Sequence, residues 1–166
     1  MSPHPHDQLV SRKAGPLVGS VPIPGDKSIS HRSLIFGSLA IGTTKVRSLL
    51  ESADVMSTKD ALVALGASIE RDADGVWHIT GVGLHGMISP LAPLDLGNSG
   101  TGARLLMGVV AGQNITATFY GDASLSVRPM ARITEPLAEM GADITCRIGG
   151  LLPVTIAGAA NPMALN

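Results

Sequence analysis

The chain has 166 residues, of which 45% are hydrophobic but only 2% aromatic, and its formal net charge is −1. This length fits a single domain, and an aliphatic core with 20 glycines favours a layered protein of helices and strands. The basic residues are dispersed, which excludes the positive surface that duplex nucleic acid requires, so no nucleic acid is expected as a partner.

The single cysteine, Cys146, excludes an internal disulfide and gives no metal-site spacing, as in proteins of a reducing cytoplasm. We interpret it as a small buried hydrophobic residue. Residues 1–14 lack the apolar segment of a secretory signal and are expected to form a flexible tail. Because the apolar stretches at 88–94 and 105–111 are short, no membrane partner is expected, and a cytoplasmic location is predicted.

The first predicted elements form a unit that closes near position 81. A short strand near 17–23 precedes this unit. The unit itself is expected to consist of a helix at 28–40, a strand at 44–47, a second helix that ends at position 65, and two strands at 68–71 and 76–80. Gly66 follows the second helix at the position where a glycine commonly ends one.

The same order of elements recurs further along the chain. Its members are expected at 99–111, 116–120, 135–140, 143–147 and 152–156. The phrase Asp60-Ala-Leu-Val-Ala-Leu-Gly-Ala-Ser-Ile is echoed by Glu135-Pro-Leu-Ala-Glu-Met-Gly-Ala-Asp-Ile, which makes Gly141 the counterpart of Gly66. This duplication predicts a stack of two similar α/β modules whose helices share one interior, connected by the Gly- and Pro-rich residues 83–93.

The stretch Pro-Gly-Asp-Lys-Ser-Ile-Ser-His-Arg places Lys27 and Ser28 at a helix start, with Arg32 on the same helical face as Ser28. Backbone N–H groups, hydroxyls and positive charge at such a place favour an anion site. The alternative is a plain N-cap, which accounts for most serines at helix starts. An ATP-binding P-loop is excluded, because Asp26 separates the nearest glycine from Lys27.

A second stretch, Leu-Gly-Asn-Ser-Gly-Thr-Gly-Ala-Arg, ends at Arg104 and repeats this arrangement. Its Asn98 and Thr101 are candidate caps, and Gly100 allows a ligand to approach the backbone. In a third stretch, Arg128 precedes a proline at a predicted helix start, where an arginine opposes the helix dipole and needs a compensating anion or acid. The alternative for this residue is a solvated surface arginine.

In order and spacing, the three stretches resemble the amino-terminal signatures of the 5-enolpyruvylshikimate-3-phosphate synthases. The phrases Leu-Leu-Glu-Ser-Ala-Asp and Met-Gly-Ala are similar to the bacterial branch of that family, so the resemblance covers the chain from about Gly15 onward. It implies the inside-out repeat fold of the enolpyruvyl transferases, of class α/β (α+β), with two helix-strand-helix-strand-strand repeats of the first domain.

The resemblance also implies which residues bind the substrates, phosphoenolpyruvate and shikimate 3-phosphate. Lys27 would be the catalytic residue and would contact phosphoenolpyruvate, whereas Ser28 and Arg32 would hold shikimate 3-phosphate. Gly100 and Arg128 would form part of the phosphoenolpyruvate pocket. Because both substrates are multiply anionic, a cleft of cationic side chains and helix N-termini would bring the two like-charged molecules together.

Asn98 would also belong to the substrate site, with Thr101 and Arg104 as supporting residues. In this family the 5-hydroxyl of shikimate 3-phosphate attacks phosphoenolpyruvate while the methylene carbon is protonated, and the tetrahedral intermediate loses phosphate. The reaction serves aromatic amino acid biosynthesis, and the resemblance implies no cofactor and no metal. With no side chain at Gly100, the pocket is expected to leave room for the phosphonate inhibitor glyphosate.

Chains of this family are far longer, with two domains of three repeats each. Residues 15–25 are therefore expected to be a strand and hinge of the second domain, 26–158 two of the three repeats of the first domain, and 159–166 a truncated connection. The carboxylate proposed as the base lies in the second domain, so the isolated chain is expected to be catalytically incomplete. A separate chain that supplies the missing carboxy-terminal part is a candidate partner.

Two alternatives remain open. The sister enzyme, UDP-N-acetylglucosamine enolpyruvyl transferase, shares the fold, but in it asparagine follows the lysine and a loop carries a reactive cysteine. Here Ser28 follows Lys27, and Cys146 lies in a predicted strand. The other alternative is a non-catalytic anion-binding half that needs a complementing chain, which exposed apolar surface would reveal.

Overall fold

A computed structural model describes residues 10–164 of the chain. The helices are α1 (Lys27–Leu39), α2 (Ala53–Ala64), α3 (Gly100–Ala111) and α4 (Ala131–Glu139), with a 3-10 turn η1 (Leu125–Val127). The strands are β1 (Ile41–Val46), β2 (Ser68–Arg71), β3 (Trp77–Val82), β4 (Leu94–Asp95), β5 (Thr116–Tyr120), β6 (Asp143–Arg147) and β7 (Leu151–Ala157). The predicted order of helix, strand, helix, strand, strand occurs twice, with β4 and η1 added to the second copy.

The two sheets share one topology. Strand β3 lies between β1 and β2, and β7 lies between β5 and β6, with antiparallel pairing throughout; β4 adds a parallel edge beside β5. A threonine pair marks the same register in each sheet. Thr43 Oγ1 lies 3.1 Å from Thr80 Oγ1, and Thr118 Oγ1 lies 2.9 Å from Thr155 Oγ1. The duplication in the sequence therefore extends to the hydrogen bonding across the strands.

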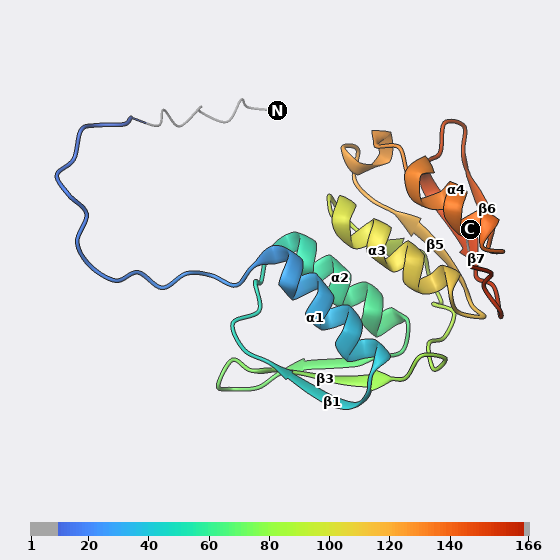
Figure 1. The fold of residues 1–166 in the computed structure, drawn as a ribbon, viewed down its shortest axis with the longest axis horizontal. Helices are drawn as coiled ribbons and strands as arrows, with labels where there is room; N and C mark the ends of the chain where they lie inside the picture. The colour runs from blue at the N-terminus through green and yellow to red at the C-terminus, as the bar shows by residue number, and fades with distance from the viewer. Residues whose placement is uncertain (1–9, 165–166) are drawn as a thin grey trace.

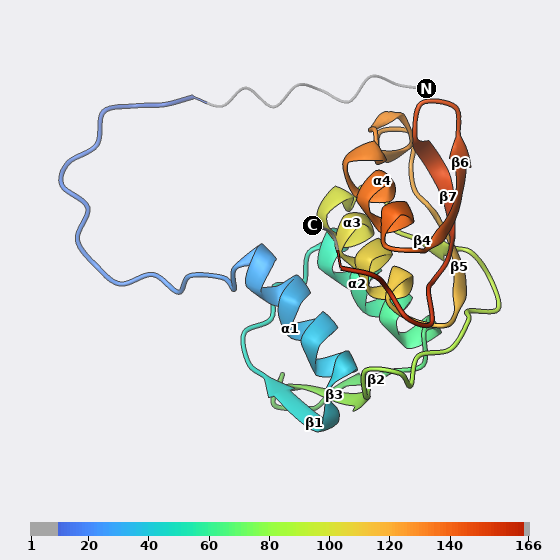
Figure 2. The same ribbon diagram turned by 45° about the vertical axis from the view of Figure 1, so that its right-hand side comes forward.

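The helices α1 to α4 lie side by side within the angle formed by the two sheets (Figures 1 and 2). Apolar side chains of both copies meet in one cluster, which extends from Leu34 and Ile79 in the first copy to Leu106 and Phe119 in the second. Burial of this shared cluster is the main favourable contribution to folding. The helices thus have one interior, as the duplication predicts.

Two glycines end helices, and two others allow strands to pass close to the ends of helices. Gly66 and Gly141 follow α2 and α4 with φ of 108° and 105°, which confirms their predicted role as helix terminators. At Gly81 a Cβ would lie 2.3 Å from the carbonyl oxygen of Ala40, and at Gly158 a Cβ would lie 2.0 Å from a carbonyl oxygen beyond α3. Only glycine fits where these strands pass the ends of α1 and α3.

The strand expected near 17–23 does not form in this chain. Residues 10–26 contain no helix or strand, and most of this segment extends away from the folded body (Figure 1). The side chains of Leu17 and Val18 are 95% and 96% exposed. A strand needs a neighbouring strand to satisfy its backbone N–H and C=O groups, and no strand among residues 10–164 pairs with this segment. Its assignment to a second domain stays a prediction.

The interpretation of Cys146 as a buried residue is wrong, because its side chain is exposed. It lies on β6, which is the outer strand of its sheet and is exposed at all positions except Ile144. Outer strands have neighbours on one side only, so side chains on them are covered less. In the part of the chain that the structure describes, no helix is long and apolar enough to cross a membrane.

Candidate functional site

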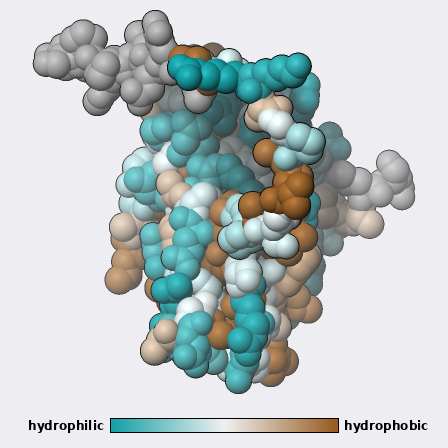
Figure 3. Space-filling view, turned by 90° about the vertical axis from the view of Figure 1, so that its left-hand side faces the viewer, coloured by the Kyte–Doolittle hydropathy of each residue, from teal (hydrophilic) through white to brown (hydrophobic). Residues whose placement is uncertain are grey.

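The N-termini of α1, α2 and α3 lie at the same end of the molecule, to the upper left in Figure 1. Hydrophilic residues cover much of this end (Figure 3). Asp26 caps α1, where its Oδ1 accepts from the N–H of Ile29 at 2.8 Å, and Ser99 caps α3, where its Oγ accepts from the N–H of Gly102 at 3.2 Å. The remaining N–H groups and the partial positive charge of three helices make this end attractive to anions.

At the start of α1, the Lys27 ammonium forms an ion pair with the carboxylate of Asp54, in the first turn of α2. The two side chains are 48% and 23% exposed. Asp54 was not among the site residues expected from the sequence. The signal was present in the phrase Leu-Leu-Glu-Ser-Ala-Asp, since an acid in the first turn of a helix is favoured by the dipole and can neutralise a nearby cation.

Arg32 and Ser28 lie on one face of α1, as their spacing predicts. The Arg32 Nη1 donates to the Ser28 carbonyl oxygen at 3.2 Å, and both residues are exposed. Ser28 is not the N-cap, because Asp26 takes that position. A plain capping role for Ser28 is therefore excluded, and the residue is exposed one position after Lys27.

Arg128 is held by neutral oxygens. Its Nη2 donates to Asn98 Oδ1 at 2.6 Å and to Ser124 Oγ at 3.0 Å, and Asn98 Nδ2 donates in turn to Asp122 Oδ2 at 2.9 Å. The backbone N–H of Leu125 lowers the pKa of Asp122 most; burial opposes this effect, and the Asn98 amide lowers the pKa further. The acid expected near Arg128 is thus present, but it acts through Asn98.

The position of Arg128 differs from the expectation that it stands at the N-terminal end of a helix whose first turn contains Pro129. It caps the end of η1, and α4 begins only at Ala131. The proline that follows, Pro129, lies in the short connection and accepts a hydrogen bond at its carbonyl oxygen. A 3-10 turn therefore brings the guanidinium group to the start of α3 instead of to its own helix.

Two guanidinium groups lie over Gly100. Arg104 Nη1 donates to the Gly100 carbonyl oxygen at 3.0 Å and its Nη2 donates to the Pro129 carbonyl oxygen at 3.1 Å. A Cβ at Gly100 would lie 2.9 Å from Arg104 Nη1 and 3.2 Å from Arg128 Nη1. We call Asn98, Gly100, Arg104 and Arg128 the arginine cluster. Paired guanidinium forks suit the bidentate recognition of carboxylate and phosphate groups.

The structure therefore divides the expected site residues into two sets. Four of them form the arginine cluster, and Lys27, Ser28 and Arg32 share the first turns of α1; Thr101 is exposed in the first turn of α3. Asp122, like Asp54, was missed, although its position after Gly121 in a Ser-rich turn was a signal for a turn-capping carboxylate. Within residues 10–164 no group of three or more His, Cys, Asp or Glu side chains is arranged to hold a metal ion.

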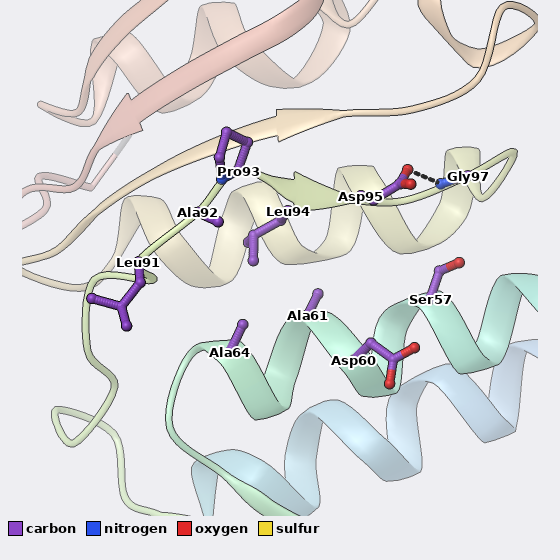
Figure 4. A pocket seen from close by; sticks show the side chains of 10 residues that line it. All are labelled: Ser57, Asp60, Ala61, Ala64, Leu91, Ala92, Pro93, Leu94, Asp95 and Gly97. Atoms are coloured by element: carbon purple, nitrogen blue, oxygen red, sulfur yellow. Dashed lines mark hydrogen bonds between the residues drawn. The ribbon is translucent and has the colours of Figure 1, made fainter.

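A cleft of about 510 Å³ between α2 and β4 is a separate feature (Figure 4). It begins at Gly97, whose N–H donates to Asp95 Oδ1 at 2.9 Å, and follows α2 past Ala61 to Ala64. Its walls are mainly small and apolar, and none of the expected site residues lines it. The cationic groups at the helix starts, not this cleft, carry the chemistry that an anionic substrate needs.

Comparisons with known proteins agree on one family. Residues 11–164 match the family model described as EPSP synthase (3-phosphoshikimate 1-carboxyvinyltransferase). Two similar proteins have that enzyme's name: one from Parvibaculum lavamentivorans, 54% identical over 99% of this chain and 37% of its own length, and one from Novosphingobium aromaticivorans, 60% identical over 87% and 33%. A solved structure of EPSP synthase from Acinetobacter baumannii is 45% identical, with a TM-score of 0.84, over 89% of this chain and 33% of that chain.

The chain thus spans about a third of the length of the curated relatives that it matches. The range of this chain that the family model matches, residues 11–164, includes both copies of the repeated unit and all the residues of the two sets described above.

Proposed function

This chain belongs to the EPSP synthase family, and from that premise we propose that it takes part in the transfer of the enolpyruvyl group of phosphoenolpyruvate to the 5-hydroxyl of shikimate 3-phosphate. The observation that supports this most is the arginine cluster. Arg104 and Arg128 both face Gly100 at the start of α3, close to the N-termini of two further helices. Such an arrangement suits a small ligand with both a carboxylate and a phosphate group.

In this proposal the two sets of residues have different ligands. Gly100 and Arg128 contact phosphoenolpyruvate, Asn98 holds the Arg128 guanidinium group in place, and Arg104 supports the backbone at Gly100 and Pro129. Ser28 and Arg32, on the exposed face of α1, hold shikimate 3-phosphate.

Lys27 is the proposed catalytic residue. The 5-hydroxyl gives up its proton to a base, expected from the second domain, and its oxygen attacks C2 of phosphoenolpyruvate while C3 takes up a proton. The tetrahedral intermediate then loses one proton from C3 and inorganic phosphate from C2 to give the enol ether. The Lys27 ammonium can stabilise the charge that develops and donate the proton to C3. To do so it must exchange its ion pair with Asp54 for a contact with the substrate. The reaction belongs to the shikimate pathway of aromatic amino acid biosynthesis, and we propose a cytoplasmic location.

Isothermal titration of shikimate 3-phosphate and then phosphoenolpyruvate into the chain tests the proposal. Lys27→Ala and Arg128→Ala are expected to weaken binding about tenfold or more, since each removes a charge-assisted hydrogen bond. Lys45→Ala is the control, because Lys45 is an exposed lysine on β1 that is not among the expected site residues. Equal affinity in all four proteins would contradict the assignment of the site.

A second candidate is the same anion site in a part that needs a complementing chain for turnover. An apolar groove of about 380 Å³ between α1 and α3, beside which Phe36 is 66% exposed, favours it. A complementing chain would cover that groove. If the chain alone releases phosphate from phosphoenolpyruvate when shikimate 3-phosphate is also present, this candidate is excluded. Binding of both substrates without phosphate release is the result expected from it.

A further inference from the structure

Two contacts, one helical turn apart, join the first turns of α1 and α2. The outer contact is the ion pair between Lys27 and Asp54. The inner contact joins the residues four positions further along each helix: His31 Nδ1 lies 2.9 Å from Thr58 Oγ1, and both side chains are fully buried. Because a helical turn takes 3.6 residues, the inner pair lies directly below the outer pair.

The surroundings of the two ring nitrogens indicate the protonation state of His31. Nε2 is buried and has no hydrogen-bond partner among the described residues, so a proton there would be left without an acceptor. Nδ1 lies 2.9 Å from Thr58 Oγ1, a hydroxyl that can accept from the ring while it contacts the Asp54 carbonyl oxygen at 3.3 Å. We therefore assign the proton of the neutral ring to Nδ1.

Thr58 also sets the approach of the third helix. A Cβ at Gly102, in the first turn of α3, would lie 2.4 Å from Thr58 Oγ1, so the hydroxyl packs directly against the backbone of α3. The residue two positions earlier is Gly100, over which Arg104 and Arg128 lie. The pair of His31 and Thr58 therefore contacts all three helix starts from below.

The charges around His31 oppose its protonation. Burial and then Lys27 lower its pKa, Asp54 raises it, and Arg32 lowers it further. An imidazolium here would lie beside Lys27 with an unpaired Nε2–H. The unfolded chain takes up this proton below about pH 6.5, so the stability of the fold decreases as the pH falls through that value.

We propose that His31 is a positioning residue of the anion site: through Thr58, its neutral ring sets the spacing of the first turns of α1, α2 and α3, and hence of Lys27 relative to the arginine cluster. The ring does not touch the substrate. This inference rests on the function proposed above, which supplies the ligands for one of its two tests.

The first test is titration of phosphoenolpyruvate into four variants. His31→Leu and Thr58→Ala remove the donor and the acceptor, and each is expected to weaken binding about tenfold. His31→Asn keeps an N–H at the position of Nδ1, and Thr58→Ser keeps the hydroxyl, so both are expected to stay within about twofold of the unmodified chain.

The second test needs no substrate and therefore separates this inference from the proposed function. Nitrogen NMR shifts of the His31 ring should show Nδ1 protonated at pH 7, with exposed His85 as the control. The amide signals of Gly102 should move in His31→Leu and Thr58→Ala but not in the two conservative variants. Nε2 protonation, unmoved Gly102 signals, or phosphoenolpyruvate binding by His31→Leu as tight as that of the unmodified chain would each overturn the proposal.

Discussion

The starts of α1 and α3 occupy equivalent places in the two copies, yet they hold their cations in opposite ways. At α1, Lys27 belongs to the helix itself and is neutralised by a carboxylate, Asp54, from the neighbouring helix. At α3, Arg128 comes from the chain beyond β5 and is held by the neutral oxygens of Asn98 and Ser124. The duplication supplies two helix starts of the same geometry, and local side chains decide how much positive charge each one offers.

This difference has a consequence for binding. An anion at α1 would compete with the Asp54 carboxylate for Lys27, whereas an anion at α3 would meet guanidinium groups that no carboxylate among residues 10–164 contacts directly. We therefore propose that the start of α3 binds anions more tightly than the start of α1 in the free chain. The backbone that both copies share should therefore determine folding, whereas the side chains that differ between the copies should determine anion binding.

The largest effects are expected on folding stability, from the two glycines that occupy equivalent positions in the two copies. Gly81→Ala and Gly158→Ala each place a Cβ within 2.3 Å of a carbonyl oxygen at the end of α1 or α3, and each should destabilise the fold by about 3 kcal/mol, as measured by urea unfolding. Gly108→Ala is the control: nothing lies within 4 Å of its Cβ in α3, and it should stabilise the fold by about 0.5 kcal/mol. A large loss at only one of the two glycines would break the equivalence of the copies.

Gly100→Ala should affect binding at α3 more than folding. Its Cβ would lie 2.9 Å from Arg104 Nη1 and 3.2 Å from Arg128 Nη1, so both guanidinium groups must move. We expect phosphoenolpyruvate and glyphosate to bind about tenfold more weakly in calorimetric titrations. Gly108→Ala should leave both affinities unchanged. Tight binding of both ligands to Gly100→Ala would mean that the arginine cluster is not their site.

Asp54→Asn, at the start of α2 beside Lys27, should strengthen anion binding instead of weakening it. Removal of the carboxylate frees Lys27, so inorganic phosphate should bind about threefold more tightly, while the exposed ion pair accounts for only about 0.5 kcal/mol of stability. The comparison variant is Asn98→Ala, which removes a neutral support of Arg128 and should weaken phosphate binding. If both variants weaken phosphate binding, Asp54 orients Lys27 for the anion instead of competing with the anion for Lys27.

The smallest effect is expected from Asp122→Asn. Because the pKa of Asp122 is lowered in the fold, the carboxylate contributes stability above about pH 4, and this contribution is lost as the pH falls through the folded pKa. The variant should show a slightly lower Tm at pH 7, and this difference in Tm should become smaller as the pH falls below about 4. A difference in Tm that stays constant as the pH falls would indicate that the amide changes the turn itself.

The order of the elements could be predicted because its signals are local. Apolar periodicity and turn residues lie next to the elements they define, so the strands 68–71, 116–120 and 143–147 were predicted at their observed bounds. The same holds for the residue types of the anion site: Lys27 and Arg128 stand out because cations at helix starts need partners. Non-local pairing has no such signal, and the strand near 17–23 was expected but finds no partner strand in this chain.

The sequence by itself determined the duplicated frame, the helix starts and the cationic residues on them, because all of these follow from neighbours along the chain. Only the tertiary structure decided what those residues contact. Asp54 lies 27 positions from Lys27, Thr58 lies 27 from His31, and Asn98 lies 30 from Arg128. Packing of the helices against one another brings these groups together. Local sequence patterns do not show which helices pack against each other, so they could not predict these contacts.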